Sequence, residues 1–470
     1  MITYPMIIGG RAVTTRETID VVNPADGSIV ARCANGTVEH LDEAVAAANK
    51  ALPAWSALPD ATRVSQLLAV AALIEQHQSA LSELITREQG KTQSGPGANL
   101  EVGGCIAWTR ATAALSLPDE IIENTPNNQI TLRRKPVGVV ASITPWNWPL
   151  MIAIWHIAPA LRVGCTVVIK PSPFTPLSTL ELVRLMNTVL PEGVINVVTG
   201  GADVGDRMSS HPGVNKVVFT GSTATGKRVM RQAVDTLKRL TLELGGNDAG
   251  IILPGTTIDP LLEKLFWGCF INCGQTCAAL KRLYVHADQY EEVVSKFAAY
   301  VSTIPVGNGM DPRYLIGPLT NKMQLQKVAA YVEDARVNGA RIVTGGAMTD
   351  GPGYFYPLTV VADATDNMLI VREEQFGPAI PILKYKTVEE ALARANSLDT
   401  GLGGSVWGND LQSATELATR LECGTAWVNQ HGALHPMAPF GGIKGSGVGV
   451  EFNVDGLREY TTVQVLNVSR

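Results

Sequence analysis

With 470 residues, the chain is too long for one ordinary hydrophobic core, so two or three domains are expected. Hydrophobic residues make up 46% and charged residues 17% of the sequence, which is typical of a soluble globular protein. The net charge of −5, without any basic cluster, gives no electrostatic reason to expect a nucleic acid or an anionic membrane as a partner.

Targeting and membrane signals are not evident. The first residues, MITYPMIIGGRAV, lack a basic region followed by an apolar run, so we expect no secretory signal. The longest apolar stretch, residues 149–161, is interrupted by His156 and is too short to cross a bilayer. Seven cysteines, an odd number spread thinly over a long chain, do not resemble a disulfide framework. These features predict a reduced, cytoplasmic protein.

Helical patterns come first along the chain. Residues 39–51, EHLDEAVAAANKA, carry apolar residues at helical spacing and are rich in alanine, which predicts an exposed amphipathic helix. Residues 60–91 continue in the same manner, and Gly90 is the expected helix stop.

From Val137 the pattern changes to short β-branched runs, each ending in a turn and separated from the next by helical segments. The first series consists of VGVVASITP, CTVVIKPS, GVINVVTGG and KVVFTGST, and the second of DAGIIL, KRLYVH, RIVTGG, FGPAIPILKY, GLGGSVWG and GTAWVN. This alternation predicts parallel sheets covered by helices on both faces, in two α/β domains joined near residue 245. Two more predicted strands, 130–135 and 460–468, could pair with each other or with another subunit.

Seven separated motifs then point in one direction. In chain order they are PWNWP (145–149), KPSPFTP (170–176), FTGSTATG (219–226), LELGG (242–246), GQTC (274–277), EEQFGP (373–378) and PFGGIKGSG (439–447). With these motifs the chain resembles the NAD(P)-dependent aldehyde dehydrogenase superfamily, of the non-acylating, hydrolytic type, along nearly its whole length.

The resemblance implies an α/β fold with three parts. A Rossmann-like NAD(P)-binding domain is expected over residues 1–124 and 141–244, and an α/β catalytic domain over 245–445. A small β oligomerisation arm is expected over 125–140 and 446–470, and the family usually assembles as homodimers or homotetramers.

Three of the cysteines, Cys269, Cys273 and Cys277, follow one another at four-residue spacing. A metal site would need more ligands, and no His or fourth Cys lies nearby at a usual spacing, so no metal is expected. A redox pair would normally read Cys-x-x-Cys. Aldehyde oxidation by hydride transfer needs a nucleophile that first adds to the carbonyl carbon, and a thiolate suits this role. The resemblance implies that Cys277 is this nucleophile, whereas Cys269 and Cys273 are expected to be core residues.

Two more catalytic residues are implied by the resemblance. Glu243 matches the general base that activates water to hydrolyse the thioester, and its presence favours a free acid over transfer to coenzyme A. Asn147 matches the side-chain donor to the oxyanion, with the backbone N–H of Cys277 as the second donor. Without the motifs, Glu243 would be taken for a helix-end or surface residue and Asn147 for a turn residue between prolines.

A nucleotide site is predicted where FTGSTATG follows a strand and opens a helix, because backbone N–H groups there can meet a pyrophosphate. The resemblance implies Ser222 at the phosphates, Lys170 and Ser172 at the adenosine ribose, and Glu374 at the nicotinamide ribose; taken alone, Glu374 would be an ordinary exposed carboxylate. The other expected cofactor residues are Ile143, Thr144, Pro145, Trp146, Pro173, Phe219, Gly221, Thr225, Leu244, Gly245 and Phe376.

Three positions depart from the family pattern. Many members have Glu, which binds ribose hydroxyls, where this chain has Pro173, so we expect NAD as cofactor with NADP tolerated. Asn247 replaces a more usual Lys, which we cannot interpret. Thr462 stands where some relatives carry a proton-relaying Glu, so the sequence does not indicate how Glu243 loses its proton.

The family alignment also places a substrate tunnel. The expected residues are Trp108, Trp148, Ile152, Trp155, Ile271, Thr276, Ala278 and Leu434, for which the alternative is simple core packing. Because the set is apolar and has no Arg, we expect uncharged aliphatic or aromatic aldehydes of medium to long size. Trp148 keeps a betaine-aldehyde site possible, although Ile271 replaces an aromatic residue, and a semialdehyde is the remaining option within the family.

Functions of other classes are also considered. A thiol esterase or acyl transferase could use Cys277 without redox chemistry, but it would not need the cofactor segments. A non-catalytic nucleotide-binding protein on the same fold could lose Cys277 or Glu243 freely, yet both residues are present.

Overall fold

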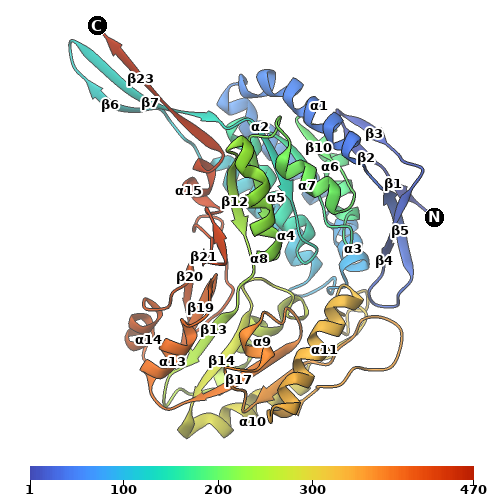
Figure 1. Ribbon diagram of the computed structural model, residues 1–470, viewed down its shortest axis with the longest axis vertical. Coiled ribbons are helices and arrows are strands. Elements are labelled where there is room, and N and C mark those ends of the chain that lie inside the picture. The colour runs from blue at the N-terminus through green and yellow to red at the C-terminus, as the bar shows by residue number, and fades with distance from the viewer.

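The larger sheet of the protein has eight strands, as seen in the computed structural model, which describes residues 1–470 (Figure 1). Its five central strands are parallel: β12 (Arg239–Glu243), β11 (Lys216–Thr220), β8 (Val139–Ile143), β9 (Thr166–Lys170) and β10 (Ile195–Val197). Three short antiparallel strands complete its edges: β22 (Gly447–Val448), β2 (Met6–Ile8) and β3 (Arg11–Val13). All four strands predicted in the first series form, whereas β12, which ends in the LELGG motif, had no strand prediction.

The strand order β12-β11-β8-β9-β10 reverses direction between β8 and β11. In open parallel sheets, ligands bind at the carboxyl ends of the strands at such a switch point. The PWNWP motif follows β8 and the GSTATG segment follows β11, so the sheet brings these two motifs to the same edge.

Helices cover both faces of this sheet (Figure 1). In α1 (Val38–Ser56), Leu41, Ala44, Val45 and Ala48 are buried at helical spacing, as the amphipathic pattern predicts. The segment 60–91 forms two helices, α2 (Asp60–Gln76) and α3 (Gln78–Gln89), because the backbone turns at His77. Gly90 ends α3 as expected, with a left-handed φ of 99° that favours glycine.

A second sheet of seven strands lies in the other half of the molecule. Its parallel strands are β16 (Thr359–Ala362), β17 (Ala379–Tyr385), β14 (Leu280–His286), β13 (Asp248–Ile252), β19 (Gly403–Trp407) and β20 (Thr425–Val428), and β15 (Arg341–Thr344) is antiparallel at the edge. The sequence pattern did not predict β16, although all four of its residues are buried. The chain leaves the first sheet at Glu243 and enters the second at Asp248.

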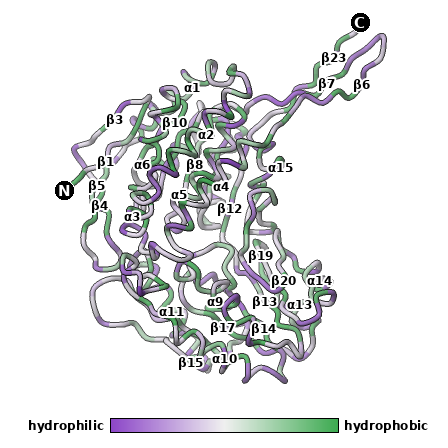
Figure 2. Tube along the Cα trace, turned by 180° about the vertical axis from the view of Figure 1, so that it is seen from behind, coloured by the Kyte–Doolittle hydropathy of each residue, from purple (hydrophilic) through white to green (hydrophobic).

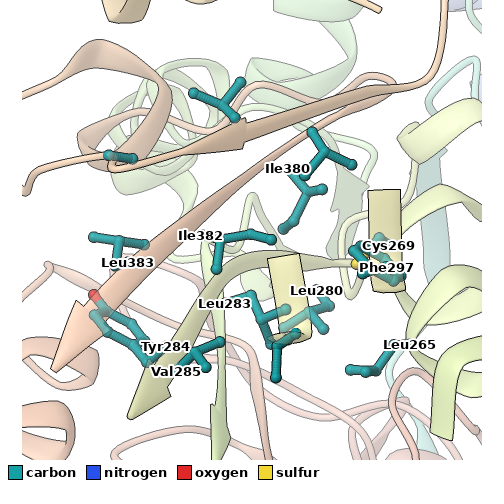
Figure 3. Close-up of a cluster of buried hydrophobic side chains, with 14 of the residues drawn as sticks. Leu265, Cys269, Leu280, Leu283, Tyr284, Val285, Phe297, Ile380, Ile382 and Leu383 are labelled. Atoms are coloured by element: carbon teal, nitrogen blue, oxygen red, sulfur yellow. The ribbon is translucent and has the colours of Figure 1, made fainter. Parts of the chain in front are cut away.

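The core beside the second sheet includes one of the three spaced cysteines. Cys269, in α9 (Leu262–Phe270), is buried near Phe297 of α10 (Tyr290–Ser302) and faces strands β14 and β17 (Figure 3). Cys273 belongs to the same hydrophobic cluster. Both cysteines are therefore core residues, as expected.

The two strands expected outside both series pair with each other. Strand β23 (Thr461–Ser469) runs antiparallel to β7 (Asn128–Pro136), which also pairs with β6 (Glu120–Asn124). This three-stranded sheet projects from the body and ends at the C-terminus (Figure 1), and apolar and polar segments alternate along it (Figure 2). Ile121, Ile122, Val463 and Val465 are all more than half exposed on it. None of the helices combines the length and the hydropathy that a membrane span requires.

Candidate active site

Cys277 lies in the loop between α9 and β14, after the short turn η3 (Ile271–Gly274). Three consecutive residues of this turn, Asn272, Cys273 and Gly274, have left-handed φ angles of 53°, 59° and 71°. Such conformations are costly for a residue with a side chain, so the surrounding structure must hold them in place. Cys277 itself is half-buried.

Side-chain amides fix this loop. Gln275 is completely buried; its Oε1 atom accepts a hydrogen bond from the backbone N–H of Thr320 at 2.9 Å, and its Nε2 atom donates to the carbonyl of Asn272 at 3.1 Å. Asn272 donates to the carbonyl of Asn147 at 2.8 Å. The Gln of the GQTC motif therefore positions the cysteine that follows it.

Two cavities meet at Cys277. One has a volume of about 350 Å³ and is largely apolar, and the other is a cleft of about 180 Å³ along the carboxyl edge of the first sheet. Cys277 lines both of them, so its sulfur can face a molecule in either. A larger hollow of about 720 Å³ lies beside α10, and no predicted site residue lines it.

The apolar cavity contains the whole predicted substrate set. All eight of these residues line it: Trp108, Trp148, Ile152, Trp155, Ile271, Thr276, Ala278 and Leu434. The rings of Trp108 and Trp155 lie 5.8 Å apart, and the indole N–H of Trp148 donates to the Thr276 hydroxyl at 3.1 Å. The wall also includes Leu100, Met151, Trp267 and His431, which the sequence did not indicate. The lining has no Asp, Glu, Lys or Arg side chain.

The cleft contains about half of the predicted cofactor set. Its lining includes Pro145, Trp146, Gly221, Ser222, Leu244, Gly245, Glu374 and Phe376. The rings of Trp146 and Phe376 meet edge to face, 5.3 Å apart. The remaining seven predicted residues do not line the cleft. Ile143, Lys170 and Phe219 lie in strands β8, β9 and β11, and Thr144, Ser172 and Pro173 follow β8 and β9. Thr225 lies in the first turn of α8 (Thr223–Ala233). The cleft also includes Gln324 and Lys327, from α11 (Lys322–Val337), for which the sequence showed no signal.

Glu243 is the last residue of β12 and is only 5% exposed. Neither carboxyl oxygen accepts a hydrogen bond from another protein group. Burial raises the pKa of Glu243 well above its usual value, and the nearby carboxyl group of Glu451 adds to the rise. Glu243 lines neither cavity, although the next two residues, Leu244 and Gly245, line the cleft. A buried acid with a strongly shifted pKa beside a cleft is a candidate general acid or base.

Asn147 is buried next to the nucleophile loop. Its Nδ2 group donates to the carbonyl of Gln275 at 2.9 Å, and since a side-chain amide has two N–H donors, one is left for another acceptor. The carbonyl of Asn147 accepts bonds from Asn272 at 2.8 Å and from Lys91 at 2.9 Å. The side chain is thereby held in one orientation beside the loop of Cys277.

Comparison with known proteins agrees with this geometry. The aldehyde dehydrogenase family, described by a sequence profile, matches residues 12–466. The chain belongs to the aldehyde dehydrogenase family. It is therefore an NAD(P)-dependent oxidoreductase that acts on an aldehyde group.

Individual relatives of this aldehyde dehydrogenase cover nearly its full length. Phenylacetaldehyde dehydrogenase from Pseudomonas fluorescens is 37% identical over 487 residues, covering 99% of this chain and 96% of its own. The structure of betaine aldehyde dehydrogenase from Staphylococcus aureus in complex with NAD⁺ has a TM-score of 0.96 at 33% identity, covering 99% of this chain and 95% of its own. The structure of an NADP-dependent enzyme from Escherichia coli has a TM-score of 0.97 at 34% identity, covering 100% and 98%.

Burial disfavours the ionised form of the thiol in this aldehyde dehydrogenase. It raises the pKa of Cys277 to about 12, and the carboxyl groups of Glu243, Glu374 and Asp248 act in the same direction, while Lys281 opposes them. No group of three or more His, Cys, Asp or Glu side chains is arranged to hold a metal ion.

Proposed function

We propose that this aldehyde dehydrogenase oxidises uncharged aliphatic or aromatic aldehydes to their carboxylic acids, with NAD as preferred cofactor and NADP tolerated. The observation that supports this most directly is the position of Cys277, where an apolar cavity and the cleft at the switch point of the sheet meet. Either cavity without the other would suit many functions. Their meeting at one thiol suits hydride transfer from a covalently held aldehyde.

The cleft has the chemistry that a dinucleotide requires. Gly221 and Ser222 stand at the start of α8, where backbone N–H groups can bind phosphate. The carboxylate of Glu374 faces the cleft and can accept hydrogen bonds from ribose hydroxyls. A side chain at Gly245 would collide with Glu374, so glycine at this point leaves room for that carboxylate at the cleft. NAD(P), when bound, supplies the hydride acceptor.

The chain's own residues would then act in sequence. The Cys277 thiolate adds to the aldehyde carbon and forms a thiohemiacetal, whose oxyanion accepts hydrogen bonds from the free Nδ2–H of Asn147 and the backbone N–H of Cys277. Loss of a hydride from this carbon leaves a thioester on Cys277. Glu243, once ionised, takes a proton from water as the water attacks the thioester, which releases the acid and the Cys277 thiolate.

The substrate class follows from the cavity wall. Without charged side chains, the wall offers no counterion to the carboxylate of a semialdehyde or to the cation of betaine aldehyde. Trp108, Trp148 and Trp155 instead offer large apolar faces, on which an aliphatic chain or an aromatic ring is removed from water. Betaine aldehyde is the second candidate, because these indole faces can also attract a quaternary ammonium group.

The proposal includes the organisation of the chain. Residues 1–124 and 141–244 would bind the cofactor, 245–445 would contribute the catalytic part, and 125–140 with 446–470 would join subunits into a homodimer or homotetramer. The exposed apolar residues of β6 and β23 support the last assignment, since a protein surface rarely leaves such a sheet uncovered. The seven unpaired cysteines fit a cytoplasmic location.

The test follows reduced nicotinamide formation with straight-chain aldehydes of increasing length, phenylacetaldehyde, betaine aldehyde and succinic semialdehyde, each with NAD and with NADP. We expect kcat/KM to rise about fourfold for each added methylene until the cavity is filled, since each buried methylene contributes about 0.8 kcal/mol. The charged aldehydes are expected to be the poorest substrates.

The matched variant is Cys277→Ala, which removes the proposed nucleophile and changes little else. We expect it to form no reduced cofactor with any aldehyde. If its rate equals that of the unchanged protein, the proposed role of Cys277 is wrong. If succinic semialdehyde or betaine aldehyde is the best substrate, the chemistry stands but the proposed substrate class is wrong.

A further inference from the structure

A buried lysine links the nucleophile loop to the cofactor cleft. Lys281 is the second residue of β14, and its side chain is only 2% exposed. Its ammonium group donates a hydrogen bond to the backbone carbonyl of Cys277 and lies 2.9 Å from the carboxylate of Glu374. A buried cation is stable only when it is paired and hydrogen-bonded, and these two contacts provide both.

The same lysine is tied to the segment that carries Glu374. The side chain of Gln375, next to Glu374, donates to the backbone carbonyl of Lys281 at 2.9 Å. Glu374 also accepts the backbone N–H of Gly246 at 3.3 Å, which is a long hydrogen bond. Lys281 therefore stands where three segments meet: the Cys277 loop, the end of the LELGG motif and the EEQFGP motif.

The charges around the thiol are unbalanced without this lysine. The charged groups that act electrostatically on the Cys277 thiol are Glu243 at the end of β12, Asp248 at the start of β13, Glu374 and Lys281. Three of these four groups are carboxyl groups, which disfavour a thiolate when they are ionised. Lys281 is the only cation among them. A thiolate is the reactive form of cysteine, so this one charge bears directly on reactivity.

We propose that Lys281 is a positioning residue that holds the Cys277 loop against Glu374 and supplies the positive charge that stabilises the Cys277 thiolate. Glu374 has the opposite effect: it pairs with Lys281 and adds a negative charge near the thiol. The inference rests on the proposed role of Cys277 as nucleophile, but its test needs neither an aldehyde nor a cofactor.

The test measures the rate at which iodoacetamide alkylates Cys277 as a function of pH, in the full-length protein without NAD(P). Peptide mass spectrometry isolates Cys277 from the other six cysteines. We expect Lys281→Met to shift the pH–rate curve to higher pH and to lower the alkylation rate near neutral pH by about tenfold or more, since a neighbouring opposite charge typically lowers a pKa by about one to three units. Lys281→Arg keeps the charge and should restore most of the rate.

Lys327→Met is the matched control. Lys327 also lines the cleft and lies near Glu374, but it is not among the charged groups that act on the Cys277 thiol. Its alkylation curve should therefore stay close to that of the unchanged protein. An unshifted curve for folded Lys281→Met, or an equal shift for Lys327→Met, would overturn the inference.

Glu374→Gln tests the inference by removing a negative charge instead of the positive one, and it keeps the inference testable if Lys281→Met does not fold. Removing this carboxylate leaves Lys281 charged and takes away one group that disfavours the thiolate. We expect alkylation near neutral pH to become faster, and a slower rate would overturn the inference. Because no aldehyde is present, a failure of the proposed oxidation would appear separately, as activity that survives Cys277→Ala.

Discussion

The ammonium group of Lys91 lies 2.6 Å from the carboxylate of Glu101, and both side chains are almost completely buried. Lys91 also donates to the carbonyl of Asn147 at 2.9 Å and lies 3.5 Å from the centre of the Trp148 ring. The other oxygen of Glu101 accepts the backbone N–H groups of Leu150 and Met151, at the start of α5 (Pro149–Val163). This ion pair thus holds the segment that carries the proposed oxyanion donor.

Removing one member of that pair should be costly. We expect Lys91→Met to lower the free energy of unfolding by about 3–5 kcal/mol, because it leaves the carboxylate of Glu101 buried without its counterion. Turnover should also fall, since Asn147 loses a contact that positions it. Urea unfolding and kcat measurements check both effects.

Arg87→Gln is the control for this prediction. Arg87 pairs with Glu83 one turn away on an exposed helix surface, where both side chains are nearly half exposed. Such a pair contributes only about 0.3–0.5 kcal/mol. Equal losses of stability in Lys91→Met and Arg87→Gln would contradict the role of the buried pair.

Gly274→Ala should damage the nucleophile loop. Gly274 has a φ of 71°, and an added Cβ atom would fall on the backbone carbonyl of Gly377. We expect the free energy of unfolding to drop by about 2 kcal/mol or more, and kcat to fall because Cys277 is displaced. Gly95→Ala is the matched control, since Gly95 has a φ of 62° but no atom near its Cβ position. If both variants lose the same stability, the close approach to Gly377 has no effect.

Activity should rise with pH. Burial raises the pKa values of Cys277 and Glu243, and each group acts only in its ionised form. We therefore expect kcat/KM to increase from about pH 6 to about pH 10, by about tenfold per unit where one ionisation limits the rate. A profile that falls over this range would show that neither ionisation controls the reaction.

Glu243→Gln should lower the turnover rate but raise the stability at alkaline pH. In the folded protein the pKa of Glu243 is raised above its unfolded value, so the stability linked to its protonated form is present at low pH and is lost as the pH rises through the folded-state pKa. The Gln side chain of the variant does not ionise, so its stability does not fall with pH for this reason. We expect the variant to turn over far more slowly but to be more stable than the unchanged protein at alkaline pH. Thermal unfolding at acidic and alkaline pH checks the sign of the difference.

Pro173→Glu should increase the preference for NAD over NADP. Pro173 lies in an exposed turn directly after β9, where a carboxylate would meet the adenosine ribose in the proposed site. We expect kcat/KM with NADP to fall by about fivefold or more relative to NAD, because two like charges about 4 Å apart in water repel by about 1 kcal/mol. Pro173→Gln, which is similar in size but uncharged, should leave the ratio nearly unchanged. If the NADP-to-NAD ratio of kcat/KM falls equally in both variants, the effect comes from the shape of the new side chain and not from its charge.

Local patterns were sufficient for most of the fold. The β-branched runs from Val137 onward form strands because alternating turns and helices leave them buried on both faces, and Gly90 ends α3 because glycine adopts a left-handed φ freely. The break at His77 was not predicted, because helical spacing continues across it. Strand β16 was not predicted, although its residues, TVVA, include three β-branched ones and are all buried.

The sequence by itself determined the family, through seven motifs in order, and all eight residues that it indicated for the substrate tunnel line the apolar cavity. Only the tertiary structure placed Lys91, Lys281 and Lys327 beside the site. A lysine in a helix or strand is normally solvated, and no local pattern marks the few that become buried. The proposed role of Lys281 arises because folding buries its side chain and places Glu374, far away in the chain, 2.9 Å from its ammonium group. Charge pairs of this kind depend on distances in three dimensions, which residue spacing does not encode.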